Sequence, residues 1–277
     1  MLRIIESTKI TEAVAQLCIE SNICISPDIR EALERSRDCE VLPLATSVLD
    51  TLLKNADIAE REQLPICQDT GMAVVFVEIG TNVHVNGDVT AAINEGVRRG
   101  YAEGCFRNSV VREPIGENRI NTGDNTPAVI HYDFVAGDEL KITVAPKGFG
   151  SENMGGVRML MPSDGVNGVE DYVVEMVTKA GANPCPPVIV GVGIGGTMEK
   201  AALLSKKALL RDVGEPISEL ETRILVRIND SGIGAAGFGG KTTALGVHIL
   251  TYPTHIAGLP VAVNIGCHAT RHKAVIL

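Results

Sequence analysis

The stretch NPCPPVIVGVGIGG, residues 183–196, combines a cysteine-bearing proline loop, an apolar run and a glycine-rich turn. The apolar run Val188–Val192 is bounded by turn residues, which predicts a short buried strand. The glycines predict a tight turn, and the helical pattern after them predicts a helix beside the strand. A strand, a turn and a helix in succession indicate mixed α/β structure in this part of the chain.

The sequence before this stretch begins with helices. Residues 7–60 carry apolar side chains at helical spacing. Pro27 occupies the favoured first position of one helix, and another helix is expected after Pro43. We expect an α+β fold, in which a helical N-terminal region of residues 1–62 packs on a mixed α/β core of residues 63–277.

The core is expected to contain several further strands. Its periodic segments predict strands at residues 73–79, 128–134, 139–145, 246–252 and 260–265. The turn Ala136-Gly137-Asp138 predicts that 128–134 and 139–145 form a hairpin. The sequence shows no internal repeat and no low-complexity linker, so we expect residues 1–277 to form a single domain.

Composition limits the class of protein. The chain has 277 residues, of which 45% are hydrophobic and 21% charged, and it contains no tryptophan, which predicts a globular protein with an aliphatic core. A formal charge of −9 argues against a nucleic-acid partner. The apolar runs are too short for a membrane span, and residues 1–20 do not resemble a secretory signal. We therefore expect a cytoplasmic protein with no membrane partner.

Two glycine motifs suggest nucleotide binding, but their surroundings argue against it. Residues 191–196 match the dinucleotide pattern GxGxxG, yet no strand ending in an acidic residue follows about 20 positions later. Residues 239–242 resemble the end of a phosphate-binding loop, but Ala235 stands where its first glycine belongs, and residues 243–250 read as a strand. An NAD-dependent oxidoreductase is therefore a distant alternative.

Seven cysteines are present, and three of them lie in loops rich in proline or glycine, namely Cys67, Cys185 and Cys267. The odd count and the absence of a CxxC pair argue against a disulfide framework and a zinc ribbon. Scattered cysteines are often small buried hydrophobic residues. Three loop thiolates can also hold an iron–sulfur cluster and leave one iron open as a Lewis acid.

The segments around these cysteines resemble those of class I fumarases, which are iron–sulfur hydro-lyases that interconvert fumarate and malate. The L-tartrate dehydratases are closely similar to this family. The segments that carry the resemblance are CQDTG at 67–71, KGFGSEN at 147–153, NPCPP at 183–187 and NIGCHATRH at 264–272. Phe106-Arg107-Asn108-Ser109 and Tyr252-Pro253-Thr254-His255 belong to the same resemblance.

The resemblance implies a cluster and a catalytic pair. Cys67, Cys185 and Cys267 are expected to bind a 4Fe–4S cluster, whose fourth iron would accept the leaving hydroxyl. Asp69 is expected to be the catalytic carboxylate, and His255 its proton-shuttling neighbour.

The resemblance also implies how substrate is bound and which partner is needed. Gln68, Arg107 and Gly150 are expected to bind a small dicarboxylate, for which the guanidinium of Arg107 offers a bidentate contact. The chain corresponds to the N-terminal part of the family, so we expect a beta subunit and a higher oligomer of alpha–beta pairs.

The expected reaction is reversible hydration of fumarate to L-malate. The alternative within the family is L-tartrate dehydratase. A non-catalytic cluster-binding or metal-binding protein is a third possibility.

Overall fold

The computed structural model describes residues 2–277, which form two compact units. Unit 1 comprises the residues up to Ile25, Ala56–Phe149 and Arg271–Leu277. Unit 2 comprises Ser26–Asn55 and Gly150–Thr270. These boundaries differ from the expected regions 1–62 and 63–277, because the early helices are shared between the units. The expectation of a single domain stays a prediction.

Unit 1 is built on a four-stranded sheet in the order β10-β5-β2-β4. Its strands are β2 (Met72–Gly80), β4 (Val129–Val135), β5 (Leu140–Lys147) and β10 (Lys273–Ile276). β2 is parallel to β4 and antiparallel to β5. The expected hairpin of β4 and β5 is therefore wrong, since β2 lies between these two strands. β1 (Arg3–Glu6) and β3 (Val83–Asn86) form a small parallel pair.

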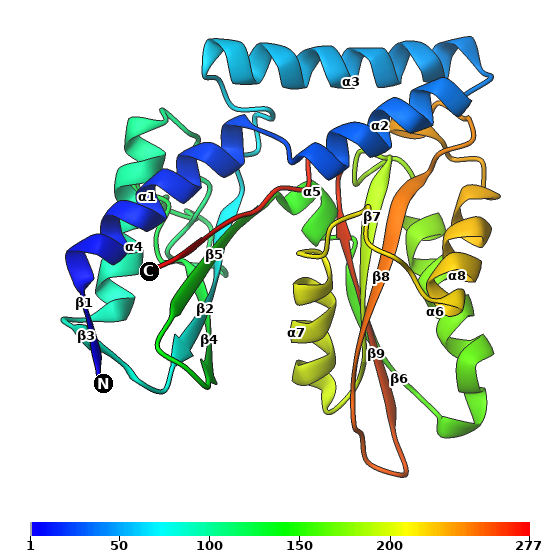
Figure 1. The fold of residues 1–277 in the computed structure, drawn as a ribbon. Helices are drawn as coiled ribbons and strands as arrows, with labels where there is room; N and C mark the ends of the chain where they lie inside the picture. Colours follow the sequence, from blue (N-terminus) through cyan, green and yellow to red (C-terminus); the bar gives the residue numbers. More distant parts are fainter. Residues whose placement is uncertain (1) are drawn as a thin grey trace. The chain divides into compact units, whose positions relative to one another are not determined.

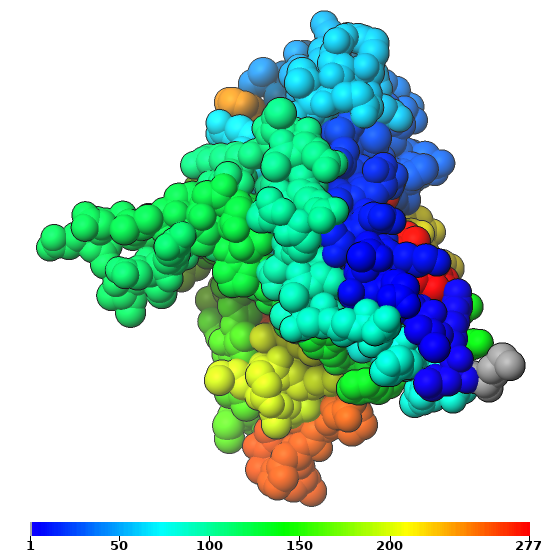
Figure 2. All heavy atoms as spheres, turned by 90° about the vertical axis from the view of Figure 1, so that its left-hand side faces the viewer, coloured from blue at the N-terminus to red at the C-terminus, as the bar shows by residue number. Residues whose placement is uncertain are grey.

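Two helices cover the sheet of unit 1. α1 (Ser7–Ile23) and α4 (Val89–Glu103) lie side by side (Figures 1 and 2). Ile10 and Val14 of α1 and Val97 of α4 are fully buried in the same cluster as alternate residues of β2. The period of 3.6 in the helices and of 2 in the strand brings these side chains to one interface.

Unit 2 has a second four-stranded sheet, in the order β6-β9-β7-β8. Its strands are β6 (Gly156–Leu160), β7 (Val188–Gly195), β8 (Ala244–Tyr252) and β9 (Leu259–Gly266). α7 (Met198–Ala208) covers one face, and α6 (Gly165–Ala180) and α8 (Glu219–Asn229) cover the other (Figure 1).

The remaining helices connect these elements. α2 (Pro27–Cys39) belongs to unit 2, and α3 (Pro43–Glu62) begins in unit 2 and ends in unit 1. The expected helix starts at Pro27 and near Pro43 are confirmed. Short helical turns are α5 (Phe149–Glu152), η1 (Pro162–Asp164) and η2 (Ala235–Gly237). The expected α+β class is confirmed. Among residues 2–277, every helix is too short or too polar to cross a membrane.

The glycines at 191–196 serve the packing of α7 on β7. A Cβ at Gly193 would collide with the carbonyl oxygen of Ala201, and one at Gly191 with that of Ser205. The missing side chains let the helix lie directly on the strand. This supports a tight strand-to-helix turn in place of a dinucleotide site.

The glycine-rich segment before β8 already holds a carboxylate. The Lys241 N–H donates to Glu40 Oε2 at 2.7 Å, at the place where a phosphate-binding loop would present its amides. The chain then continues as strand β8, as expected, and a phosphate-binding helix start is lacking there.

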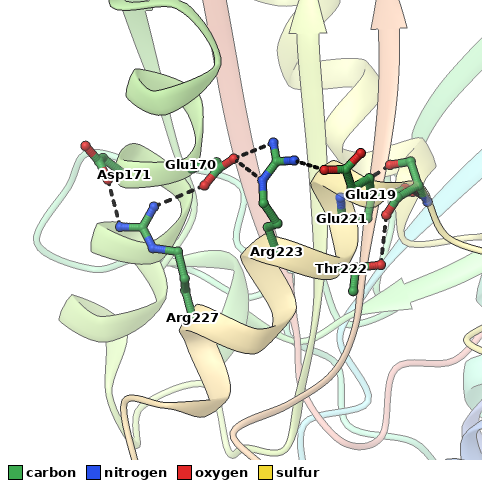
Figure 3. Close-up of polar contacts among 8 residues, drawn as sticks. Glu170, Asp171, Glu219, Glu221, Thr222, Arg223 and Arg227 are labelled. Atoms are coloured by element: carbon green, nitrogen blue, oxygen red, sulfur yellow. Dashed lines mark hydrogen bonds and ion pairs between the residues drawn. The ribbon is translucent and has the colours of Figure 1, made fainter.

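Ion pairs join α6 to α8 in unit 2. Arg223 and Arg227 of α8 both contact the buried carboxylate of Glu170, at 2.7 and 3.4 Å, and Arg227 also reaches Asp171 (Figure 3). At its start, α8 is capped by Ser218 and Glu221, whose side chains bond each other's backbone N–H groups.

Candidate functional site

In unit 1, the loop Cys67–Gly71 connects the end of α3 to the start of β2. Cys67 is half-buried, and the Asp69 N–H lies 3.4 Å from its Sγ. Gln68 is exposed and Asp69 is half-buried. The loop therefore presents a thiol, an amide and a carboxylate within three consecutive residues.

The carboxylate of Asp69 has a fixed orientation. Its Oδ2 accepts the Phe149 N–H at 2.8 Å, and its Oδ1 accepts the Gly71 N–H at 3.0 Å. An ionised carboxylate offers about four acceptor positions, so two amide bonds leave capacity for a substrate proton.

Arg107 lies beside the same loop. Its carbonyl oxygen accepts the hydroxyl of Thr70 at 3.0 Å, and its side chain is exposed. Unit 1 thus brings together four of the expected site residues, which are Cys67, Gln68, Asp69 and Arg107.

In unit 2, Cys185 and Cys267 lie at one end of the sheet. Cys185 precedes β7 and Cys267 follows β9, and these antiparallel strands pair Ile189 with Gly266. The backbone N–H of His268 lies 3.3 Å from the Cys185 carbonyl oxygen, and its Nδ1 lies 3.0 Å from the same atom.

Gly150 joins this group. A Cβ at Gly150 would lie 3.6 Å from the carbonyl oxygen of Asn183, which is two residues before Cys185. Unit 2 therefore brings together Gly150, Cys185 and Cys267.

His255 lies elsewhere in unit 2. It follows β8, and the hydroxyl of its neighbour Thr254 donates to the Gly196 carbonyl at the far end of β7. The eight residues of β9 separate it from Cys267, a span of roughly 26 Å at the rise of a strand. Unit 2 does not bring His255 to the cysteines, and its role stays a prediction.

The three loop cysteines fit a cluster by their donor chemistry. Cys185 is exposed, and Cys67 and Cys267 are half-buried, so their sulfur atoms are accessible to a metal. Cys18 is different, because burial raises the pKa of its thiol to about 12. Among residues 2–277, the structure brings no three His, Cys, Asp or Glu side chains into a metal-binding group, so the three-cysteine site stays a prediction.

Sequence reasoning missed the side chains that hold the Cys67–Gly71 loop. Three consecutive carbonyl groups of this loop accept hydrogen bonds from side chains. The donors are Arg271 for Asp69, Tyr101 for Thr70, and both Tyr101 and Asn125 for Gly71. Arg271 lies within a segment that carried the resemblance, whereas Tyr101 belongs to the apolar pattern of α4 and gave no signal of a polar contact.

The chain is similar to known proteins over almost its whole length. The family model described as fumarate hydratase (Fumerase) matches residues 11–276. A protein of Methanocaldococcus jannaschii with the provisional name L(+)-tartrate dehydratase subunit alpha is 42% identical over 272 residues, which are 95% of each chain. The L(+)-tartrate dehydratase subunit alpha of Escherichia coli O157:H7 is 33% identical over 278 residues, covering 97% of this chain and 91% of that protein.

The fold and the family match define an enzyme of the hydro-lyase class. Within this class, the chain belongs to the fumarate hydratase (Fumerase) family.

Proposed function

We propose that this chain is the alpha subunit of an iron–sulfur hydro-lyase that interconverts fumarate and L-malate, with L-tartrate as the alternative substrate. The observation that carries the proposal is the Asp69 carboxylate, which is oriented by two amide bonds and stands two residues from Cys67. The description of the matching family supports fumarate. The names of the relatives support tartrate.

We propose that Cys67, Cys185 and Cys267 hold a 4Fe–4S cluster. When bound, such a cluster would supply a Lewis acid for the hydroxyl that leaves as water. The support is the donor set itself, which consists of three accessible loop thiols, two of them on neighbouring strand ends.

The second requirement of the reaction is removal of a proton from the substrate, and side chains of this chain can meet it. The proton to be removed is on a carbon beside a carboxylate and is weakly acidic, so a base must be held close to it. Asp69 is this base, since its carboxylate is oriented and retains free acceptor positions. Arg107 binds a substrate carboxylate, and the amide of Gln68 and the backbone N–H of Gly150 orient the substrate.

His255 is proposed as a proton shuttle on the family resemblance alone. An imidazole exchanges protons near neutral pH and could relay the proton that Asp69 takes. Within unit 2, the length of β9 separates His255 from Cys267, so the proposed role is not supported by proximity to the cysteines of that unit.

The partner is proposed to be a beta subunit. The relatives are named as alpha subunits, which supports a second subunit that completes the enzyme. We propose alpha–beta pairs that assemble into a higher oligomer in the cytoplasm.

The test is to co-express the chain with its beta partner, purify it without oxygen, and assay two reactions in parallel. Fumarate loss is followed by ultraviolet absorption, and tartrate dehydration by the keto acid formed. Oxygen-sensitive activity on fumarate supports the proposal, and preference for tartrate selects the alternative. A cluster-loaded complex that is inactive on both substrates would contradict the proposed function. Nicotinamide-linked absorbance change would favour an oxidoreductase.

A further inference from the structure

The last three residues of the Cys67–Gly71 loop, Asp69, Thr70 and Gly71, lie directly before β2, which begins at Met72. Their carbonyl groups are outside the strand ladder. Each accepts a side-chain donor in place of a strand partner. The Thr70 oxygen accepts the Tyr101 hydroxyl at 2.7 Å, and the Gly71 oxygen accepts the same hydroxyl at 3.2 Å and Asn125 Nδ2 at 3.1 Å. The Asp69 oxygen accepts Arg271 Nη2 at 2.8 Å.

Tyr101 is a buried side chain whose polar end contacts this loop. Its residue is 1% exposed, and its ring packs edge-to-face on Phe106, 5.7 Å between centroids. Burial raises the pKa of Tyr101, so the phenol keeps its proton and remains a donor. A phenylalanine would fill the same space, so the hydroxyl itself contributes the contact with the loop.

Arg271 is also buried, at 5% exposed, although arginine usually lies at the surface. It follows Cys267 by only four positions in the sequence, and its guanidinium donates to the backbone of Asp69. A charged donor makes a stronger hydrogen bond to a carbonyl than a neutral one.

We infer that Tyr101, Asn125 and Arg271 are positioning residues, which fix the backbone of the Cys67–Gly71 loop and thereby the directions of the Cys67 thiol and the Asp69 carboxylate. The inference rests on the proposed function for the role of those two groups. Its physical basis is that a loop outside the ladder has few backbone partners, and each side-chain bond removes a way for it to rearrange.

The first test is hydrogen–deuterium exchange on the full chain in its complex with the beta subunit. Tyr101→Phe removes one hydroxyl and keeps the ring. We expect the amides of residues 67–71 and Phe149 to exchange about five-fold faster, and those of α1 to be unchanged. Tyr172→Phe is the matched control, because Tyr172 is 3% exposed but lies in unit 2. Unchanged exchange at 67–71 in Tyr101→Phe would overturn the inference.

The second test is turnover with a conservative rescue. We expect Tyr101→Phe to lower kcat about ten-fold and Tyr172→Phe to leave it within two-fold. Arg271→Lys retains one cationic donor and should keep several-fold more activity than Arg271→Gln at equal cluster content. Equal activity of the two Arg271 variants would contradict a positioning role for Arg271. A wild-type complex without hydro-lyase activity would refute the proposed function, whereas the exchange test would still decide whether these side chains fix the loop.

Discussion

At the scale of single residues, substitution of Asp69 tests whether its carboxylate acts as a base. Asp69→Asn keeps the size of the side chain and one acceptor oxygen, but an amide is a poor base. We expect turnover to fall by about 10²- to 10⁴-fold. The amide nitrogen cannot accept one of the two backbone N–H groups that Asp69 now binds, so we also expect the melting temperature to fall by about 2–4 °C. The measurement is kcat in the alpha–beta complex at equal cluster content, read from visible absorbance. Near-normal turnover would remove Asp69 from the mechanism.

His248 makes the stability of unit 2 depend on pH. It is 0% exposed on β8, and both ring nitrogens lack a hydrogen-bond partner in the described structure. Burial lowers the pKa of His248, the positive charge of Arg211 lowers it further, and the carboxylates of Glu221, Glu215 and Asp28 oppose the shift. The unfolded chain therefore takes up a proton at a higher pH than the folded chain does.

Above pH about 6.5, the usual pKa of histidine, His248 is neutral in both states and does not reduce stability. As the pH falls below that value, the unfolded chain binds a proton that the folded chain does not, and the free energy of unfolding falls by up to about 1.4 kcal/mol per pH unit. This loss ends when the pH reaches the lowered pKa of His248 in the folded chain. We expect His248→Phe to flatten the pH dependence of urea unfolding between about pH 5 and 7. His84→Gln is the control, because His84 is exposed. An equal pH dependence in wild type and His248→Phe would contradict this account.

How much of the site could be predicted differs from residue to residue. Cys67, Gln68 and Asp69 are adjacent in the sequence, so their proximity required no knowledge of the fold. Arg107 lies near this loop because its carbonyl oxygen accepts the Thr70 hydroxyl. Gly150 lies near Cys185 because it packs against the carbonyl group of Asn183. Such contacts between distant segments arise from tertiary packing, which local patterns do not encode.

At the scale of elements, the packing of α7 on β7 depends on glycine. Gly193→Ala would place a methyl group against the Ala201 carbonyl, so helix and strand would have to separate. We expect a loss of about 1–3 kcal/mol in the free energy of unfolding, measured by urea denaturation. Gly214→Ala is the control, because a Cβ there would meet nothing within 4 Å. A Gly193→Ala loss no larger than the control's would contradict close packing at this position.

Strand pairing was the part of the fold that sequence predicted least well. The strands at 72–80, 140–147 and 259–266 were expected within two residues, because their apolar pattern is strong. The hairpin of β4 and β5 was wrong, since a turn sequence reports the bend and not which strand lies beside it. Edge strands such as β6 and β10 were missed, because they have four or five residues and a mostly exposed or half-buried pattern.

At the scale of the whole molecule, the path of the chain links the two units by four connections. The chain passes from one unit to the other after Ile25, Asn55, Phe149 and Thr270. The segment Ser26–Asn55 belongs to unit 2, and the chain on both sides of it belongs to unit 1. After Thr270 the chain returns to unit 1, where β10 pairs with β5. If one unit unfolded, its segments would become long flexible loops between the segments of the unit that stays folded. Closing such loops costs entropy, which would destabilise the folded unit.

We therefore expect the whole chain to unfold in one cooperative transition, as a single domain does. The measurement is amide exchange in increasing urea, comparing peptides of α1 in unit 1 with peptides of β7 in unit 2. Coincident midpoints are the expected result, and His248→Phe should shift both midpoints together at pH 5.5, since a stability change in one unit is then shared by the other. Two midpoints separated beyond error, or a shift confined to β7, would mean that the units unfold independently and that the covalent crossings do not couple them.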